Sequence, residues 1–159
     1  NSGEIMVSSD SEKLQAPAKT NLTRSLDEDA RYALMRNGSR LFKEADPFYR
    51  SLGLTGLQYN VLRVLEAVEE ELPQQEIARR VLASRANITS LIDQLEEKGL
   101  VERHTGDDRR VKRIRITQKA LDMLERTYDE ILAISAGLMK NLSSEEKKEL
   151  LRLVEKLEA

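Results

Sequence analysis

The chain has 159 residues, of which 40% are hydrophobic and 34% charged, and its formal net charge is −2. This is about one globular domain, and no apolar run reaches the roughly 20 residues that cross a bilayer. The absence of cysteine excludes disulfides, thiolate metal sites and thiol nucleophiles, and a single histidine leaves little for metal binding or acid–base catalysis.

The N-terminal third of the sequence predicts a tail and two helices. The first 25 residues are rich in Ser, Lys and Ala and lack apolar periodicity, which is typical of a flexible tail. Apolar residues at helical spacing then predict a helix over Asp27–Asp46, which Pro47 ends or bends. Thr55 and Gln58 have the spacing of a capping box, so we expect a second helix to begin there.

Two short helices follow in close succession. Pro73 suits the first turn of a third helix over Gln74–Val81. Ser84 is a favourable N-cap for a fourth helix, and Gly99 is a suitable terminator for it. The buried side of the fourth helix would consist of Ile88, Leu91, Ile92 and Leu95. This spacing is that of a helix-turn-helix, although a generic helical hairpin has the same outline.

The spacing of apolar residues changes from helical to alternating after the fourth helix. Residues 100–104 and 111–116 read as two short strands, and residues 105–108 between them have turn chemistry, so a β-hairpin is predicted. Residues 103–119 carry seven basic and two acidic side chains, a local charge of +5 in an acidic chain. Such a run is often only a solvated face, but a local positive field also attracts phosphate.

Helical periodicity returns for the rest of the chain. Thr117 is expected to cap one long helix, and Ser143 with Glu146 forms a second capping box that opens a final helix. The long helix has a coiled-coil-like seam of Leu121, Leu124, Tyr128, Ile131, Ser135, Leu138 and Leu142. That seam has more apolar surface than one small unit can cover, although a bundle within one chain could also bury it.

The exposed side of the fourth helix is chemically suited to DNA. Its first half carries small and amide side chains, and Asn87 could pair with adenine and Arg85 with guanine in a major groove. An ordinary polar surface explains this helix equally well. The predicted hairpin favours the DNA interpretation, because Arg109 and Arg110 at its tip suit insertion into a minor groove. Asp108 would hold a neighbouring arginine, unless it only forms the turn.

These segments, in this order, resemble the MarR family of transcriptional regulators. The resemblance is carried by Leu54–Leu62, Gln75–Arg80, Ser84–Arg103 and Asp107–Thr117. It implies a mainly α fold with a small β-hairpin wing, formed by a winged helix-turn-helix over residues 55–117. It also implies a helical dimerisation region over residues 26–54 and 118–159 of a homodimer.

The resemblance assigns roles to particular residues. Base contacts on the recognition helix would come from Ser84, Arg85, Asn87, Thr89 and Ser90. In the wing, Arg109 or Arg110 would enter the minor groove and Asp108 would position it. Many members have a basic residue where this chain has Ser90, so a phosphate or guanine contact there is in doubt.

Many members of the family also sense small aromatic or anionic molecules between the dimer helices and the winged unit. The residues that could line such a pocket here are Tyr32, Met35, Arg36, Phe42, Tyr59 and Met123, although a simple core position is the favoured interpretation of each. This chain cannot sense peroxide through cysteine, as other members do, because it has no cysteine. We expect no cofactor and no metal site.

The sequence therefore predicts a cytoplasmic, dimeric regulator that binds a palindromic operator in double-stranded DNA and does not associate with membranes. We expect a repressor that a small effector releases from DNA. The alternative is a winged-helix dimer that acts as a protein-interaction module without reading DNA. An enzyme is not expected, because no nucleophile–base pair, metal cluster or phosphate-binding glycine loop occurs in the sequence.

Overall fold

The computed structural model describes residues 25–68, 70–81, 83–105 and 111–158. The chain divides into two compact units, Asn1–Met35 and Arg36–Ala159. The predicted tail lies outside the described residues except for Ser25, whose hydroxyl accepts a hydrogen bond from the backbone N–H of Glu28. No helix in the described ranges is long and apolar enough to cross a membrane.

Helix α1 (Leu26–Ser51) is longer than the sequence predicts. The expected end at Asp46 is wrong, because the helix continues through Pro47 to Ser51. Pro47 removes one backbone donor, which costs stability within a helix. The last turn brings Phe48 and Tyr49 into the core, and their burial outweighs that loss.

Helix α2 (Gly56–Glu66) begins at the predicted capping box. The backbone N–H of Gln58 donates to the Thr55 hydroxyl at 3.2 Å, and the Gln58 side chain accepts from the Thr55 backbone N–H at 3.0 Å. Helices α3 (Gln74–Arg80) and α4 (Arg85–Glu97) follow, as expected for a helix-turn-helix. Gly99 has a φ of 68°, the left-handed conformation that suits glycine at the end of a helix.

The predicted hairpin is part of a three-stranded sheet with the order β1-β3-β2. Strands β2 (Val101–Thr105) and β3 (Lys112–Ile116) are antiparallel, with Val101 opposite Ile116 and Arg103 opposite Ile114. Strand β1 (Leu72–Pro73) pairs with β3 and was not expected from the sequence. A strand of two residues is too short to show the alternation of apolar and polar residues by which strands are predicted from sequence.

The long helix predicted after Thr117 is two helices, α5 (Gln118–Arg126) and α6 (Tyr128–Leu138), so a single helix is wrong. Thr127 separates them, and its hydroxyl donates to the carbonyl oxygen of Met123 at 2.8 Å. Such a bond competes with the backbone ladder and bends helices. Helix α7 (Ser144–Glu158) then starts at the predicted capping box, with the backbone N–H of Ser143 donating to the Glu146 carboxylate at 2.7 Å.

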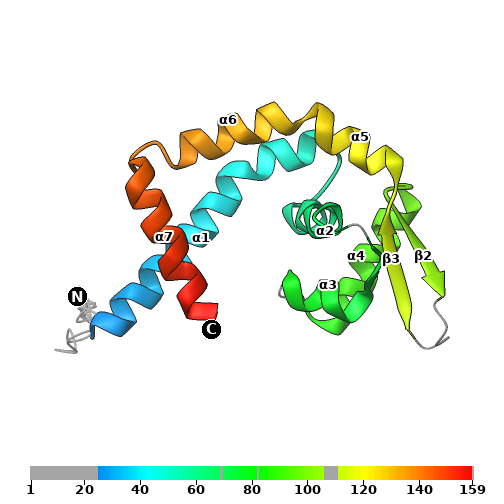
Figure 1. Cartoon of the computed structure of the whole chain (residues 1–159), viewed down its shortest axis with the longest axis horizontal. Helices are drawn as coiled ribbons and strands as arrows, with labels where there is room; N and C mark the ends of the chain where they lie inside the picture. The colour runs from blue at the N-terminus through cyan, green and yellow to red at the C-terminus, as the bar shows by residue number, and fades with distance from the viewer. Residues whose placement is uncertain (1–24, 69, 82, 106–110, 159) are drawn as a thin grey trace, which may run out of the picture. The chain divides into compact units, whose positions relative to one another are not determined.

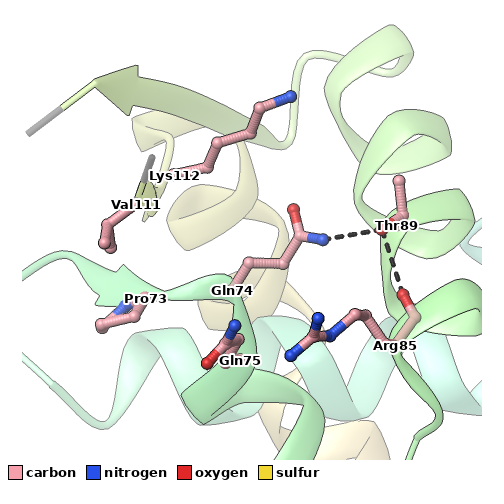
Figure 2. A pocket seen from close by; sticks show the side chains of 7 residues that line it. All are labelled: Pro73, Gln74, Gln75, Arg85, Thr89, Val111 and Lys112. Carbon is pink, nitrogen blue, oxygen red and sulfur yellow. Dashed lines mark hydrogen bonds between the residues drawn. The ribbon is translucent and has the colours of Figure 1, made fainter. Parts of the chain in front are cut away.

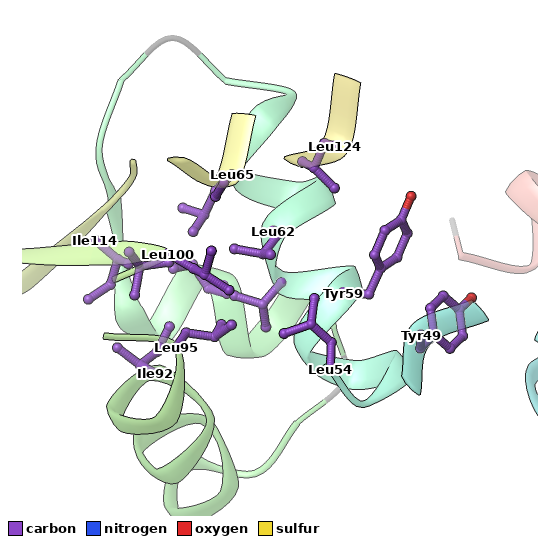
Figure 3. Close-up of a cluster of buried hydrophobic side chains, with 14 of the residues drawn as sticks. Tyr49, Leu54, Tyr59, Leu62, Leu65, Ile92, Leu95, Leu100, Ile114 and Leu124 are labelled. Carbon is purple, nitrogen blue, oxygen red and sulfur yellow. The ribbon is translucent and has the colours of Figure 1, made fainter. Parts of the chain in front are cut away.

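One hydrophobic cluster holds the winged unit together (Figure 3). Figure 1 shows α3, α4 and the β2–β3 hairpin adjacent to one another. Fully buried hydrophobic side chains come from α2, α3, α4, the sheet and α5, and they include Val61, Leu62, Leu65, Ile77, Ile88, Ile92, Leu95, Val101, Ile114 and Leu124. The core therefore fixes the orientation of α4 relative to the sheet, and the opposite side of α4 faces solvent.

Candidate nucleic-acid interface

The solvent-facing side of α4 carries all five residues that the sequence assigns to DNA. Every one of them is exposed, and they are Ser84, Arg85, Asn87, Thr89 and Ser90. Their positions follow from the burial of Ile88, Ile92 and Leu95 on the opposite side. The Ser84 hydroxyl accepts from the Asn87 backbone N–H at 3.2 Å, so Ser84 begins the helix and the Asn87 side chain projects from its first turn.

Besides Ser84, two of these five residues have their side-chain hydroxyls engaged within the protein. The Thr89 hydroxyl accepts from Nε2 of Gln74 at 2.8 Å and donates to the Arg85 carbonyl oxygen at 3.1 Å. The Ser90 hydroxyl accepts from Nε2 of Gln94 at 3.3 Å. Gln94 in turn accepts from the buried side chain of Gln58 at 2.6 Å. The polar face of α4 is thus held by hydrogen bonds from α2 and α3.

A hollow of about 320 Å³ lies beside the N-terminal half of α4 (Figure 2). Its lining comes from β1, α3, α4 and the start of β3, and comprises Pro73, Gln74, Gln75, Arg85, Thr89, Val111 and Lys112. Arg85 and Lys112 are the charged members of this lining, and both are cations. In Figure 2 the Arg85 guanidinium points toward Gln75, which lies in the first turn of α3. The electrostatic character of the hollow favours an anion such as a phosphate.

Other basic side chains of the predicted charge run are used within the protein. Arg103 donates to Glu96 at 2.8 Å and also to Asp93, which ties β2 to α4. Arg115 lies 3.2 Å from the Glu71 carboxylate, which is also 3.3 Å from Nδ1 of His104. The +5 run therefore does not present all its charge to a partner, a distinction that the charge count alone could not make.

The three residues predicted for the tip of the wing, Asp108, Arg109 and Arg110, lie outside the described residues. Their roles remain predictions. The strands that carry this segment are described on both sides, and Thr105 pairs with Lys112 at the last position of the ladder.

Two of the residues predicted for the effector pocket, Phe42 and Tyr59, lie in the second unit beside Tyr49. Phe42 lines a hollow with Gly38, Ser39, Lys43 and Asp46, which the other predicted pocket residues do not line. Tyr59 is buried, and its ring centroid lies 5.1 Å from that of Tyr49. Tyr49 also contacts Phe42, at 6.0 Å between centroids, so Phe42 and Tyr59 belong to one aromatic cluster.

The remaining pocket candidates are on α1 and α5. Tyr32, Met35 and Arg36 are exposed on α1, and Met123 is half-buried against the core. Burial raises the pKa values of Tyr49 and Tyr59, so both phenols stay neutral near pH 7. The assignment of these six residues to an effector pocket stays a prediction.

Sequence reasoning missed Gln74 and Lys112 as members of this surface. Gln74 is the first residue of α3, and it reaches α4 across the turn of the helix-turn-helix. The sequence signal for it is weak, because a glutamine at the start of a helix is a common surface residue. Lys112 was counted in the basic run, but its place beside α4 follows only from the strand pairing.

Comparisons with known proteins agree with this geometry. A family model described as the MarR family matches residues 52–111. The structure of a MarR transcription factor from Planctomyces limnophilus is 31% identical, with a TM-score of 0.63, over 84% of this chain and 98% of that one. The region that the family model matches, residues 52–111, contains α2, α3, α4 and the first strand of the hairpin, β2.

Two further similar structures share the fold at lower identity. The MepR–DNA complex of S. aureus has a TM-score of 0.70 at 23% identity and covers 80% of this chain and 94% of that one. BpsR of Bordetella bronchiseptica, solved for the mechanism by which 6-hydroxynicotinic acid regulates its DNA binding, has a TM-score of 0.74 at 18% identity. That match covers 83% of this chain and all of the other.

Proposed function

Because the chain belongs to the MarR family of transcriptional regulators, we propose that it is a dimeric repressor whose affinity for operator DNA is lowered by a small ligand. The observation that carries the DNA-binding part is the exposed polar side of α4, with Arg85 and Lys112 beside it. Arginine, asparagine and threonine at the start of a helix are the side chains that read base edges in a major groove.

The electrostatics of this surface support the same proposal. Arg85 and Lys112 have no ion-pair partner within the described ranges, whereas Arg103 and Arg115 are paired with acids. Unpaired cations beside a helix can neutralise backbone phosphates as the helix enters a groove. The similar MepR structure is a DNA complex, which supports the same use of this fold.

The proposed dimer is supported by the last helix. Helix α7 exposes large apolar side chains along its length, namely Leu150, Leu151, Leu153, Val154 and Leu157. An apolar surface of this kind on a water-exposed helix is typical of an interaction site. We assign it to a second copy of the chain, because a symmetric DNA-binding dimer also requires one. Its two α4 helices would then reach half-sites about one helical turn apart.

The effector part of the proposal has a separate basis. The aromatic cluster around Tyr49 combines apolar rings with neutral phenols, which suits a small aromatic ligand. The similar BpsR is regulated by 6-hydroxynicotinic acid, an aromatic acid. We therefore propose a ligand of this chemical class, bound where the predicted residues of two chains meet.

The test is an in-vitro selection from random duplex DNA with the full chain at moderate salt. We expect enrichment of an inverted repeat with half-sites about ten base pairs apart. Arg85→Ala should then weaken operator binding and lower the slope of log affinity against log salt by about one if Arg85 contacts a phosphate. The charge-matched control is Arg63→Ala on α2, whose partner is Glu66. Failure to enrich any sequence by an intact dimer would favour the protein-interaction module instead.

The effector is tested with the operator that the selection returns. Small aromatic acids are titrated into the protein–operator complex, and release is followed by fluorescence anisotropy. Release by such an acid, but not by an aliphatic acid of equal charge, is the expected result. A complex that no aromatic acid dissociates would contradict the ligand-released repressor while leaving DNA binding intact.

A further inference from the structure

The Thr89 hydroxyl has no proton left to give to DNA. It donates to the carbonyl oxygen of Arg85, one turn earlier in α4, and it accepts from Nε2 of Gln74. A hydroxyl carries one proton and two lone pairs, so these two bonds use its proton and one lone pair. Donation to a base would require the bond to Arg85 to break.

The same two hydrogen bonds fix the direction of the Thr89 methyl group. Threonine is branched at Cβ, so its methyl takes a set position once the hydroxyl is held against the preceding turn. Figure 2 shows the carbon end of Thr89 directed away from Gln74. Because Thr89 is exposed, this methyl is the apolar group that the residue presents on the outer side of α4.

Gln74 is held in place to make this contact. It begins α3 directly after Pro73, and its side chain is half-buried in the wall of the hollow. Its amide oxygen is buried and has no hydrogen-bond partner in the described part of the chain. The hydrogen bond from Nε2 to Thr89 is therefore the contact that accounts for the orientation of the Gln74 side-chain amide.

We propose that Thr89 recognises a thymine in each half-site through its methyl group, and that Gln74 is the positioning residue that keeps the hydroxyl turned away from the base. This inference rests on the proposed function, in which α4 occupies a major groove. Thymine differs there from the other bases by its C5-methyl, which apolar groups contact. A threonine with a free hydroxyl would instead pair with several bases. Here the Arg85 carbonyl oxygen takes the proton and Gln74 occupies one lone pair, so the two bonds together make the residue more selective for an apolar contact.

The test replaces each thymine of the selected operator, one at a time, with deoxyuridine. This change removes only the C5-methyl and keeps the Watson–Crick pairing. We expect the native protein to lose about fourfold in affinity at one thymine of each half-site, the effect of withdrawing one buried methyl from an apolar contact. Other thymines should show smaller effects.

Three variants assign that effect to the two residues. Thr89→Ser keeps the hydroxyl and removes the methyl, so it should bind the thymine and deoxyuridine operators equally. Thr89→Val keeps a methyl and removes the hydroxyl, so the preference for thymine should persist. Gln74→Met removes the donor and frees one lone pair while the bond to Arg85 remains, so the ratio of thymine to deoxyuridine affinity should decrease but stay above one. The matched control is Gln118→Met on α5, where Nε2 bonds Asp122 at 2.7 Å, and its preference should equal that of the native protein.

The outcomes separate this inference from the proposed function. Tight operator binding with no position sensitive to deoxyuridine would overturn the thymine contact and leave the regulator intact. Loss of the preference in Thr89→Val, with retention in Thr89→Ser, would show that the hydroxyl reads the base. A Gln74→Met protein that keeps the full preference would remove Gln74 from the mechanism. A selection that enriches no operator would instead reject the function on which the inference rests.

Discussion

Nη1 of Arg103 on β2 donates to the Glu96 carboxylate on α4 at 2.8 Å. The other end of the same guanidinium donates to Asp93, one turn earlier on α4. The Arg103 side chain is only 18% exposed, whereas its two partners are each at least 40% exposed. The hairpin and the helix proposed to read DNA are therefore joined by a charged clamp as well as by the core.

Removal of this clamp should destabilise the winged unit. Arg103→Met keeps the apolar stem and leaves two neighbouring carboxylates unpaired, so we expect the free energy of unfolding to fall by about 1–2 kcal/mol, reduced from the buried value by solvent screening. Urea denaturation measures the loss. Arg40→Met breaks the exposed pair with Glu44 within α1 and should cost only about 0.3–0.5 kcal/mol. Equal losses in the two variants would show that the clamp is no stronger than a surface pair.

The end of α4 depends on glycine at position 99. Gly99 has a φ of 68°, and among the described residues a Cβ added there would meet only Nζ of Lys119, at 3.8 Å. Gly99→Ala should therefore cost about 1 kcal/mol through backbone strain alone. Gly38→Ala, within helix α1 and with open space around it, should instead stabilise the protein by about 0.5–1 kcal/mol. Thermal unfolding compares the two, and a neutral Gly99→Ala would contradict the strain.

Gln58 joins the start of α2 to α4 and is 1% exposed. Gln58→Leu keeps the bulk but leaves the Thr55 backbone N–H and the Gln94 amide oxygen without their partner. We expect a loss of about 1–3 kcal/mol in unfolding free energy, because two hydrogen bonds are lost and each is worth about 0.5–1.5 kcal/mol. Gln118→Leu on the surface of α5 should change stability by less than about 0.5 kcal/mol. Similar values for both variants would refute the structural role of Gln58.

The acid stability of the protein should depend in part on Glu76. Hydrogen bonds from Arg79 and Arg80 lower the pKa of Glu76 from 4.5 to about 2. A carboxyl with a lowered folded-state pKa contributes stability that is fully present above pH 4.5 and is lost as the pH falls to about 2. Glu76→Gln should therefore flatten the pH dependence of stability in that window. Carboxyl NMR titration checks the cause, since Arg79→Ala should raise the Glu76 pKa.

The order of the elements could be predicted because local signals mark it. The capping boxes at Thr55 and Ser143 and the N-cap at Ser84 are all present in the structure. The errors arose where tertiary packing overrides such signals. Pro47 lies within a helix because Phe48 and Tyr49 beyond it are buried, and the bend at Thr127 follows from a hydroxyl bond that spacing alone does not reveal.

The same division applies to the candidate site. The exposed residues of α4 could be predicted, because the apolar spacing of Ile88, Ile92 and Leu95 fixes which side is buried. Gln74 could not, since its bond to Thr89 spans 15 residues and forms only when α3 and α4 pack together. The pairing of Arg103 with Asp93 and Glu96 could not be predicted either. It removes one cation from the basic surface that the charge count of residues 103–119 indicated.

Strand β1 gives the small sheet an edge that disfavours pairing with a second chain. It consists of Leu72 and Pro73 alone, and proline has no N–H to donate to a further strand. The opposite edge, β2, has Glu102, Arg103 and His104 in succession, which are poor partners for an incoming apolar strand. A hairpin that projects into solvent is a common starting point for aggregation. Here the sequence of both edges disfavours it, so the wing can be exposed without promoting fibre growth.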